Sequence, residues 1–217
     1  MSEAVKLRFE FEKRGKLRYI SHLDLLKLMQ RVFKRAGVPL WHTEGFNPHP
    51  YIAFGQPLSL GQEGLHELVD TKLTEAVEDT DALCAAVNAV CPEGLRMCAA
   101  YPPERPVKDI VWGEYETLLP DVSPERIPEM QARLGGESCT VMKKGGKEPV
   151  PMDILPYIDE CVIEPWEDGV RIRSRLACAP SRVLNVSYLV KGLLPGEEIY
   201  ARNCRVRLLD ENRVQFH

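Results

Sequence analysis

The sequence of 217 residues predicts an α+β fold made of two tandem ferredoxin-like (βαββαβ) units with antiparallel sheets. Two observations predict it. Segments with strand periodicity and helix periodicity follow one another in the order β-α-β-β-α-β over roughly the first hundred residues, and this order recurs in the second half. A segment containing three prolines separates the halves. We therefore expect an N-terminal domain at 1–101, a linker at 102–111 and a C-terminal domain at 112–217.

The first unit begins with a strand at 5–12, where apolar and charged residues alternate. The apolar positions that should face a core are Val5, Leu7, Phe9 and Phe11. Apolar residues at helical spacing predict a helix at 22–36, with Ser21 as its N-cap. The remaining elements are expected as strands at 51–54 and 65–74, a helix at 79–91 and a strand at 95–101.

The second unit is expected to begin with a strand at 112–119 and a helix at 124–134 that Ser123 caps. A strand at 138–143 is followed by a long excursion through 144–157. Asp168-Gly169 is typical of a hairpin turn. The other expected elements are the two hairpin strands at 161–165 and 170–177, a helix at 181–193 and a last strand at 200–208.

Composition favours a soluble, cytoplasmic protein. No apolar run approaches the roughly 20 residues of a membrane helix, and the first six residues lack the apolar core of a signal peptide. The seven cysteines include no C-x-x-C pair, which indicates reduced thiols rather than a disulfide framework, a zinc site or an iron–sulfur cluster. We expect no metal, no cofactor and no membrane association.

Charge is segregated along the chain. Residues 1–60 hold ten Lys/Arg against five Asp/Glu, residues 61–169 hold nine against 23, and residues 170–207 hold eight against two. Two basic segments could together bind a polyanion. Alternatively, the basic strands pair with acidic ones inside the protein.

The start of the first helix is one candidate binding segment. A helix start offers free amide N–H groups that favour anions, and basic residues crowd the preceding turn. The residues that we expect to contribute are Arg14, Lys16, Arg18, Tyr19, Ser21 and His22. The alternative is a helix cap beside a solvated basic turn.

The loop at 40–51 is the second candidate, because two prolines and a glycine stiffen a segment rich in functional side chains. Its aromatic residues could stack on RNA bases while its polar side chains read base edges. The predicted contacts are His42, Glu44, Phe46, Asn47, His49 and Tyr51. The alternative is a loop that only plugs the sheet edge. If the protein is an enzyme, the candidate acid–base residues are His22, Asp24 and His49, and we expect them near Glu44 and Asn47.

Two rows of arginines complete the candidates. Arg31 and Arg35 share one exposed face of the first helix. Arg171, Arg173 and Arg175 alternate with apolar residues, so they should line the open face of the second sheet. On that face they could bind a polyanion, or they could pair with Glu114 and Glu116 across the strands. We expect Arg205 and Arg207 in the last strand to repeat the pattern.

A resemblance adds context. The chain contains Arg18-Tyr19-Ile20-Ser21-His22-Leu23-Asp24, then Arg35-Ala36-Gly37-Val38-Pro39, then Gly45-Phe46-Asn47-Pro48-His49-Pro50. These motifs resemble a radical-SAM-associated bacterial family of unknown function, whose members look like companions or fusions of a radical SAM protein. One departure, Trp41-His42-Thr43, leaves the role of His42 open. In architecture alone, the chain is similar to tandem ferredoxin-like RNA-processing proteins such as the CRISPR repeat-processing endoribonucleases.

The resemblance implies a radical SAM protein as partner. We expect a non-catalytic accessory protein that binds RNA or another polyanion and presents it to that enzyme, in RNA modification or ribosome-related metabolism. The first alternative is an RNA-processing enzyme, with or without a metal, that uses His22, His42 or His49. The second is a pure protein-interaction module. No motif for reading DNA sequence occurs.

Overall fold

The computed structural model describes residues 4–144 and 148–217 and confirms the α+β class. Within the described residues there are four α-helices, nine strands in sheets and a separate two-stranded hairpin. The chain divides into two compact units. The first unit runs to Ile110 and includes Gln215–His217, and the second unit spans Val111–Val214.

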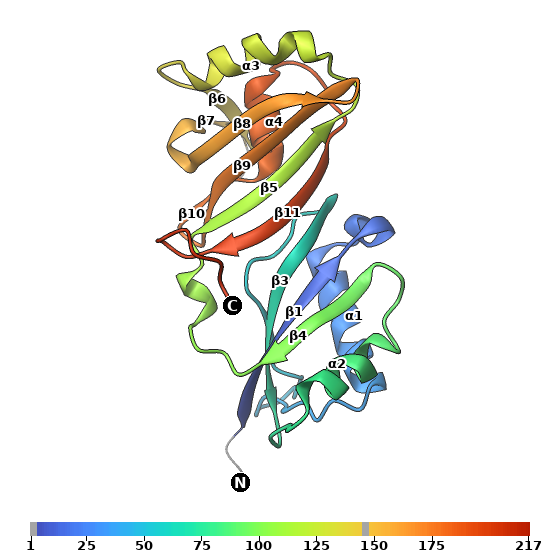
Figure 1. The fold of residues 1–217 in the computed structure, drawn as a ribbon. Coiled ribbons are helices and arrows are strands. Elements are labelled where there is room, and N and C mark those ends of the chain that lie inside the picture. The colour runs from blue at the N-terminus through green and yellow to red at the C-terminus, as the bar shows by residue number, and fades with distance from the viewer. Residues whose placement is uncertain (1–3, 145–147) are drawn as a thin grey trace. The chain divides into compact units, whose positions relative to one another are not determined.

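The first unit has the predicted order of elements, and its strand pairs are all antiparallel. The strands lie side by side in the order β4-β1-β3-β2, and α1 and α2 cover one face (Figure 1). Its elements are β1 (Val5–Lys13), a 3-10 turn (Gly15–Tyr19), α1 (His22–Arg35), β2 (Ile52–Phe54), β3 (Gln62–Leu73), α2 (Thr80–Asn88) and β4 (Leu95–Tyr101).

The core of the first unit lies between this sheet and the two helices. Three of the four predicted apolar positions of β1, Leu7, Phe9 and Phe11, are buried, as expected from the alternation. On the facing side, α1 buries Met29 and Phe33, and the rings of Phe9 and Phe33 lie 4.9 Å apart. The opposite face of α1 is thereby left to solvent.

The second unit is built on the strand order β8-β9-β5-β11, again with antiparallel pairs, while α3 and α4 pack into its core (Figure 1). Its elements are β5 (Trp112–Leu119), α3 (Ile127–Leu134), β6 (Thr140–Lys143), β7 (Val150–Asp153), β8 (Ile158–Trp166), β9 (Gly169–Ala179), β10 (Arg182–Val183), α4 (Val186–Leu193) and β11 (Arg202–Leu209). The predicted hairpin is present, but its turn lies at Glu167-Asp168, because Gly169 pairs with Trp166.

Two predictions in the second unit were wrong in detail. The helix expected at 181–193 begins at Val186, because Arg182 and Val183 pair with the end of β9 and Asn185 caps the helix. The expected excursion at 144–157 contains β7, which pairs with β6 as a small hairpin outside the main sheet. Residues 145–147, which fall within the expected excursion, lie outside the described part of the chain.

The last three residues lie with the first unit because a buried arginine holds them. Arg8 in β1 is fully buried, and its guanidinium donates to both carboxylate oxygens of Asp70, at 2.6 and 2.9 Å. It also donates to the carbonyls of His217, at 2.8 Å, and Arg105, at 2.9 Å. The ring of Phe216 lies 5.3 Å from the Arg8 guanidinium carbon and is itself buried.

Across the residues that the structure describes, none of the helices is long and apolar enough to cross a lipid bilayer.

Candidate nucleic-acid interface

The turn before α1 carries three of the predicted cationic residues. The Arg14 guanidinium lies 3.7 Å from the Glu12 carboxylate, and that of Arg18 lies 3.9 Å from Glu63. Lys16 is exposed. Carboxylates therefore offset part of the positive charge of this turn, which weakens it as an anion site.

The start of α1 is capped as predicted. The Ser21 hydroxyl accepts a hydrogen bond from the Asp24 N–H at 3.1 Å and donates one to the Asp24 carboxylate at 2.7 Å. His22 packs edge-on against Phe54, with ring centroids 5.0 Å apart, and its Nδ1 is buried without a hydrogen-bond partner among the described residues. Burial, together with the charge of Lys13, lowers the pKa of His22. Burial thus favours the neutral imidazole, which packs against Phe54.

The outer face of α1 carries the exposed cationic side chains of Arg31, Lys34 and Arg35, which we call the α1 ridge. Spacings of three and four residues place them side by side. Within residues 4–144 and 148–217, no ion pair engages any of the three. The exposure predicted for this face is confirmed.

The loop that follows α1 is a short hairpin at 41–51. The Thr43 N–H donates to the His49 carbonyl at 2.8 Å, and the Tyr51 N–H donates to the Trp41 carbonyl at 3.1 Å. These two hydrogen bonds pair the arms of the hairpin and leave 44–48 as its tip. The loop is therefore stiff, as its prolines and glycine predict.

The two histidines of this hairpin lie on opposite faces, because its side chains alternate as in a strand. Thr43 lies opposite His49, and the Thr43 hydroxyl is 3.1 Å from the His49 Nδ1, so both side chains lie on one face. His42 is paired with Pro50, one position along each arm, and therefore lies on the other face.

A backbone carbonyl selects one tautomer of His42. The His42 Nδ1 lies 3.1 Å from the Leu40 carbonyl oxygen, which only accepts, so the tautomer with its hydrogen on Nδ1 forms this bond. The Nε2 of that tautomer is left as a hydrogen-bond acceptor for a ligand. The His49 Nδ1 lies 3.1 Å from both the Asn47 carbonyl oxygen and the Thr43 hydroxyl, which can donate or accept, so these contacts do not select its tautomer.

The aromatic residues of the hairpin have different roles. The Lys72 ammonium lies 4.9 Å from the ring centroids of both Trp41 and Tyr51, so one face of each ring holds a cation. Phe46 at the tip is fully exposed, and Tyr19 beside α1 is 60% exposed. The Arg18 guanidinium carbon lies 4.8 Å from the Tyr19 ring centroid, so this ring also holds a cation. Phe46 is therefore the better candidate for stacking on a base.

Two hollows of about 620 Å³ flank the α1 ridge, and both are lined by Arg31 and Lys34. One lies between α1 and the end of α2. The other, which we call the loop-side hollow, lies between α1 and the hairpin. Its lining consists of Gln30, Arg31, Lys34, Gly37, Val38, Pro39, Leu40, His42, Pro50 and Thr74.

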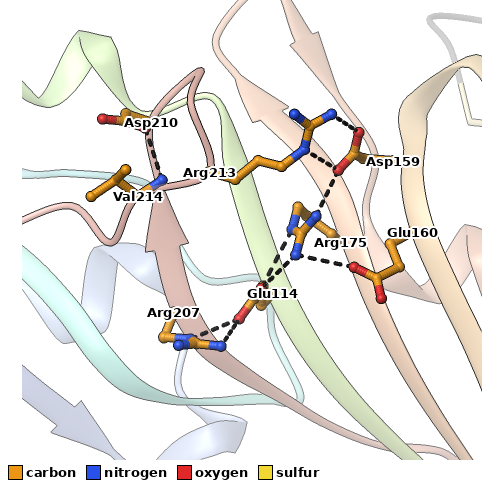
Figure 2. Close-up of polar contacts among 8 residues, drawn as sticks. All are labelled: Glu114, Asp159, Glu160, Arg175, Arg207, Asp210, Arg213 and Val214. Atoms are coloured by element: carbon orange, nitrogen blue, oxygen red, sulfur yellow. Dashed lines mark hydrogen bonds and ion pairs between the residues drawn. The ribbon is translucent and has the colours of Figure 1, made fainter.

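In the second unit, the predicted arginine row is engaged in ion pairs on the open face of the sheet. The Arg175 guanidinium contacts the carboxylates of Glu114, Asp159 and Glu160 at 3.1, 2.8 and 3.0 Å, as Figure 2 shows. Arg213 contacts Asp159 as well, at 2.6 Å. The guanidinium groups of Arg213 and Arg175 hold the pKa of the Asp159 carboxyl far below its usual range.

The other arginines of the row also form ion pairs with carboxylates. Arg171 and Arg173 both contact Glu164, at 2.6 and 3.1 Å. This face carries five paired arginines and five carboxylates, which are Arg171, Arg173, Arg175, Arg207 and Arg213 with Glu114, Glu116, Asp159, Glu160 and Glu164. The hollow of about 420 Å³ in this face is therefore close to neutral.

We expected Arg205 and Arg207 in the last strand to repeat this row of arginines on one face, and that prediction was wrong. A bulge between Arg205 and Arg207 places Arg205 opposite Tyr115, where its side chain is buried. Arg207 lies opposite Glu114 and pairs with it at 2.6 Å. The extra residue of a bulge reverses the alternation of faces, so the two arginines are not neighbours on one face.

The predicted acid–base residues have separate surroundings. His22 contacts Phe54, Asp24 bonds to Ser21, and His49 bonds within its own hairpin. Glu44 and Asn47 are exposed at the hairpin tip. In the described part of the chain, no group of three or more His, Cys, Asp or Glu residues could hold a metal ion. The contacts give no support to one acid–base site.

Fold and surface together define a two-unit α+β protein with an unpaired cationic ridge on its first unit and a charge-balanced face on its second. The chain belongs to the family described as "Uncharacterized protein conserved in bacteria (DUF2344)", whose model matches residues 6–186. This agrees with the expected bacterial family of unknown function. No curated protein matches the chain.

Two solved structures show distant similarity. The chain is 11% identical to a protein in the crystal structure of a Cbf5-Nop10-Gar1 complex, with a TM-score of 0.48, covering 92% of this chain and 49% of that one. It thus spans about half the length of that protein. An unknown protein from Galdieria sulphuraria is 12% identical, with a TM-score of 0.28, covering 93% of this chain and 99% of that one.

Proposed function

We propose that this protein is a non-catalytic accessory protein that binds RNA, or another polyanion, through its first unit. The α1 ridge carries the proposal, because its three cations are exposed and no carboxylate pairs with them in the described residues. Phosphate contacts by such cations supply most of the sequence-independent affinity for nucleic acids. The exposed Phe46 adds a ring on which a base can stack.

The distribution of ion pairs favours the first unit over the second. A polyanion that bound Arg171, Arg173 or Arg175 would have to displace Glu164, Glu114 or Asp159. The α1 ridge has no such competitor among the described side chains. We therefore assign the second unit's arginines a structural role and keep the α1 ridge as the contact surface.

The proposed partner is a radical SAM enzyme, on the strength of the sequence motifs that surround Ser21 and Phe46. The chain contains no C-x-x-x-C-x-x-C motif, so the iron–sulfur cluster and radical chemistry would belong to that partner. The strand order of both units supports the ferredoxin-like assignment. Such sheets occur in many RNA-binding proteins, so the fold is compatible with the proposal. The proposal does not rest on the fold.

The test is filter binding of the full chain to single-stranded RNA at two salt concentrations. We expect binding to weaken with salt with a slope of about 0.7 per neutralised phosphate. Arg31→Glu/Arg35→Glu should lower that slope by about 1.4, since two phosphate contacts are lost. The matched control is Arg133→Glu/Arg202→Glu, which makes the same charge change at two exposed positions of the second unit.

Salt-dependent binding that only the α1 ridge variant loses would support the proposal. If the wild type binds no RNA in a salt-dependent way, or if both double variants lose binding equally, the RNA proposal is wrong. A pure protein-interaction module would then be the better description.

A further inference from the structure

The loop-side hollow differs from the other hollows in the chemistry of its walls. Arg31 and Lys34 form one side, and His42 of the hairpin lies in its lining as well. Its lining contains no carboxylate, whereas Glu114, Glu116 and Glu160 line the hollow of the second unit. A volume of about 620 Å³ is within the usual range for small-ligand sites. The hollow is therefore suited to a small anion-bearing ligand.

Four other residues of the lining are apolar. Val38 and Leu40 are buried, and Pro39 and Pro50 are partly exposed beside them. An inorganic phosphate ion would leave such a surface uncovered. A ligand that joins a phosphate to a flat, weakly polar ring would cover it and also reach the two cations.

Gln30 and His42 add hydrogen-bonding groups to the lining, whereas the Thr74 hydroxyl donates to the Pro39 carbonyl. Gln30 supplies an amide that both donates and accepts hydrogen bonds, and the fixed Nδ1–H tautomer leaves His42 with Nε2 as an acceptor. The hollow on the other side of the α1 ridge has the same two cations but neither an amide nor an imidazole. Base edges carry the matching donors and acceptors.

We propose that the loop-side hollow binds one unpaired nucleotide of the RNA. The phosphate lies between Arg31 and Lys34, and the base lies against Val38, Leu40 and Pro50 with its edge toward Gln30 and His42. A base inside a duplex cannot enter such a hollow, so the protein selects single-stranded segments or ends. This inference rests on the proposed RNA binding and goes beyond it by naming the ligand unit and its site.

The experiment is isothermal titration calorimetry of the full chain with adenosine 5′-monophosphate, adenosine and inorganic phosphate. We expect the nucleotide to bind at least tenfold more tightly than either fragment. His42→Ala should weaken nucleotide binding fivefold or more. The matched control is His66→Ala, because it removes the same side chain from β3, where His66 contacts Glu10 and lies outside the lining of the hollow. Thermal unfolding followed by circular dichroism checks that both variants are folded.

Three results would overturn the inference: no nucleotide binding, equal binding of phosphate and nucleotide, or equal losses in both histidine variants. If the wild type still binds RNA by the filter assay in those cases, the hollow is not the nucleotide site, but the α1 ridge remains an RNA surface. If RNA binding is also absent, both proposals fail together.

Discussion

Replacing Asp70 by Asn should strongly destabilise the first unit. The change keeps the shape of the side chain and removes the negative charge that pairs with the buried Arg8 guanidinium. Arg8 has no exposed surface, and Asp70 accepts two of its four hydrogen bonds. Breaking a buried ion pair at one partner costs about 3–5 kcal/mol. That is a large share of the roughly 5–15 kcal/mol that stabilises a typical domain.

The assay is urea unfolding followed by tryptophan fluorescence. Trp41 is the only one of the three tryptophans in the first unit, so a Trp112→Phe/Trp166→Phe background reports on that unit alone. With a denaturant dependence of about 2 kcal/mol per molar urea, a loss of about 4 kcal/mol lowers the midpoint by about 2 M.

Glu12→Gln is the matched control, since it makes the same carboxylate-to-amide change at a single contact of 3.7 Å to the exposed Arg14. Surface pairs of this kind contribute about 0–1 kcal/mol. If Asp70→Asn shifts the midpoint no more than Glu12→Gln, the buried pair does not stabilise the first unit as reasoned here.

Two further predictions concern titratable side chains. Because folding lowers the pKa of His22, the unfolded chain takes up this proton first, and the free energy of unfolding should fall as pH drops below about 6.5. His22→Leu should flatten that fall when urea midpoints are compared at pH 7.5 and 5.5; an unchanged pH dependence would contradict it. Burial raises the pKa of both thiols, to about 12 for Cys161, but the Cys98 side chain is exposed and that of Cys161 is half-buried. A thiol reagent at pH 8 should therefore modify Cys98 well before Cys161, and equal rates by mass spectrometry would refute this.

Much of the fold could be predicted because local patterns agree with the tertiary structure. The alternation around Phe9 and the helical spacing around Met29 each mark one buried face, and each face packs against the other in the core. The Ser21 cap is a local feature that a short sequence motif specifies. The hairpin of β8 and β9 was also predicted, although its turn lies at Glu167-Asp168, one residue before the predicted Asp168-Gly169. Arg31 and Arg35 were correctly placed on the surface for the same reason.

The misplaced features depend on contacts that are distant in sequence. The alternation in β1 does not predict that Arg8 is buried, because its partners Asp70, Arg105 and His217 are distant in sequence. The bulge beside Arg205 has no local sequence motif and becomes visible only in the pairing with β5. Strand register also decides which charged side chains pair. Arg175 lies opposite Glu114 and is paired with it, whereas the cations of the α1 ridge lie on a helix and have no such partner among the described residues.

The hairpin at 41–51 constrains how the family can vary in length. Its arms are paired residue by residue, and one face belongs to His42 while the other belongs to His49. Inserting or deleting a single residue in either arm would exchange those faces, because strand side chains alternate with a period of two. Changes in the tip at 44–48 carry no such penalty. Among relatives, we therefore expect each arm to change in length only by an even number of residues. Single-residue gaps in alignments should be confined to the tip.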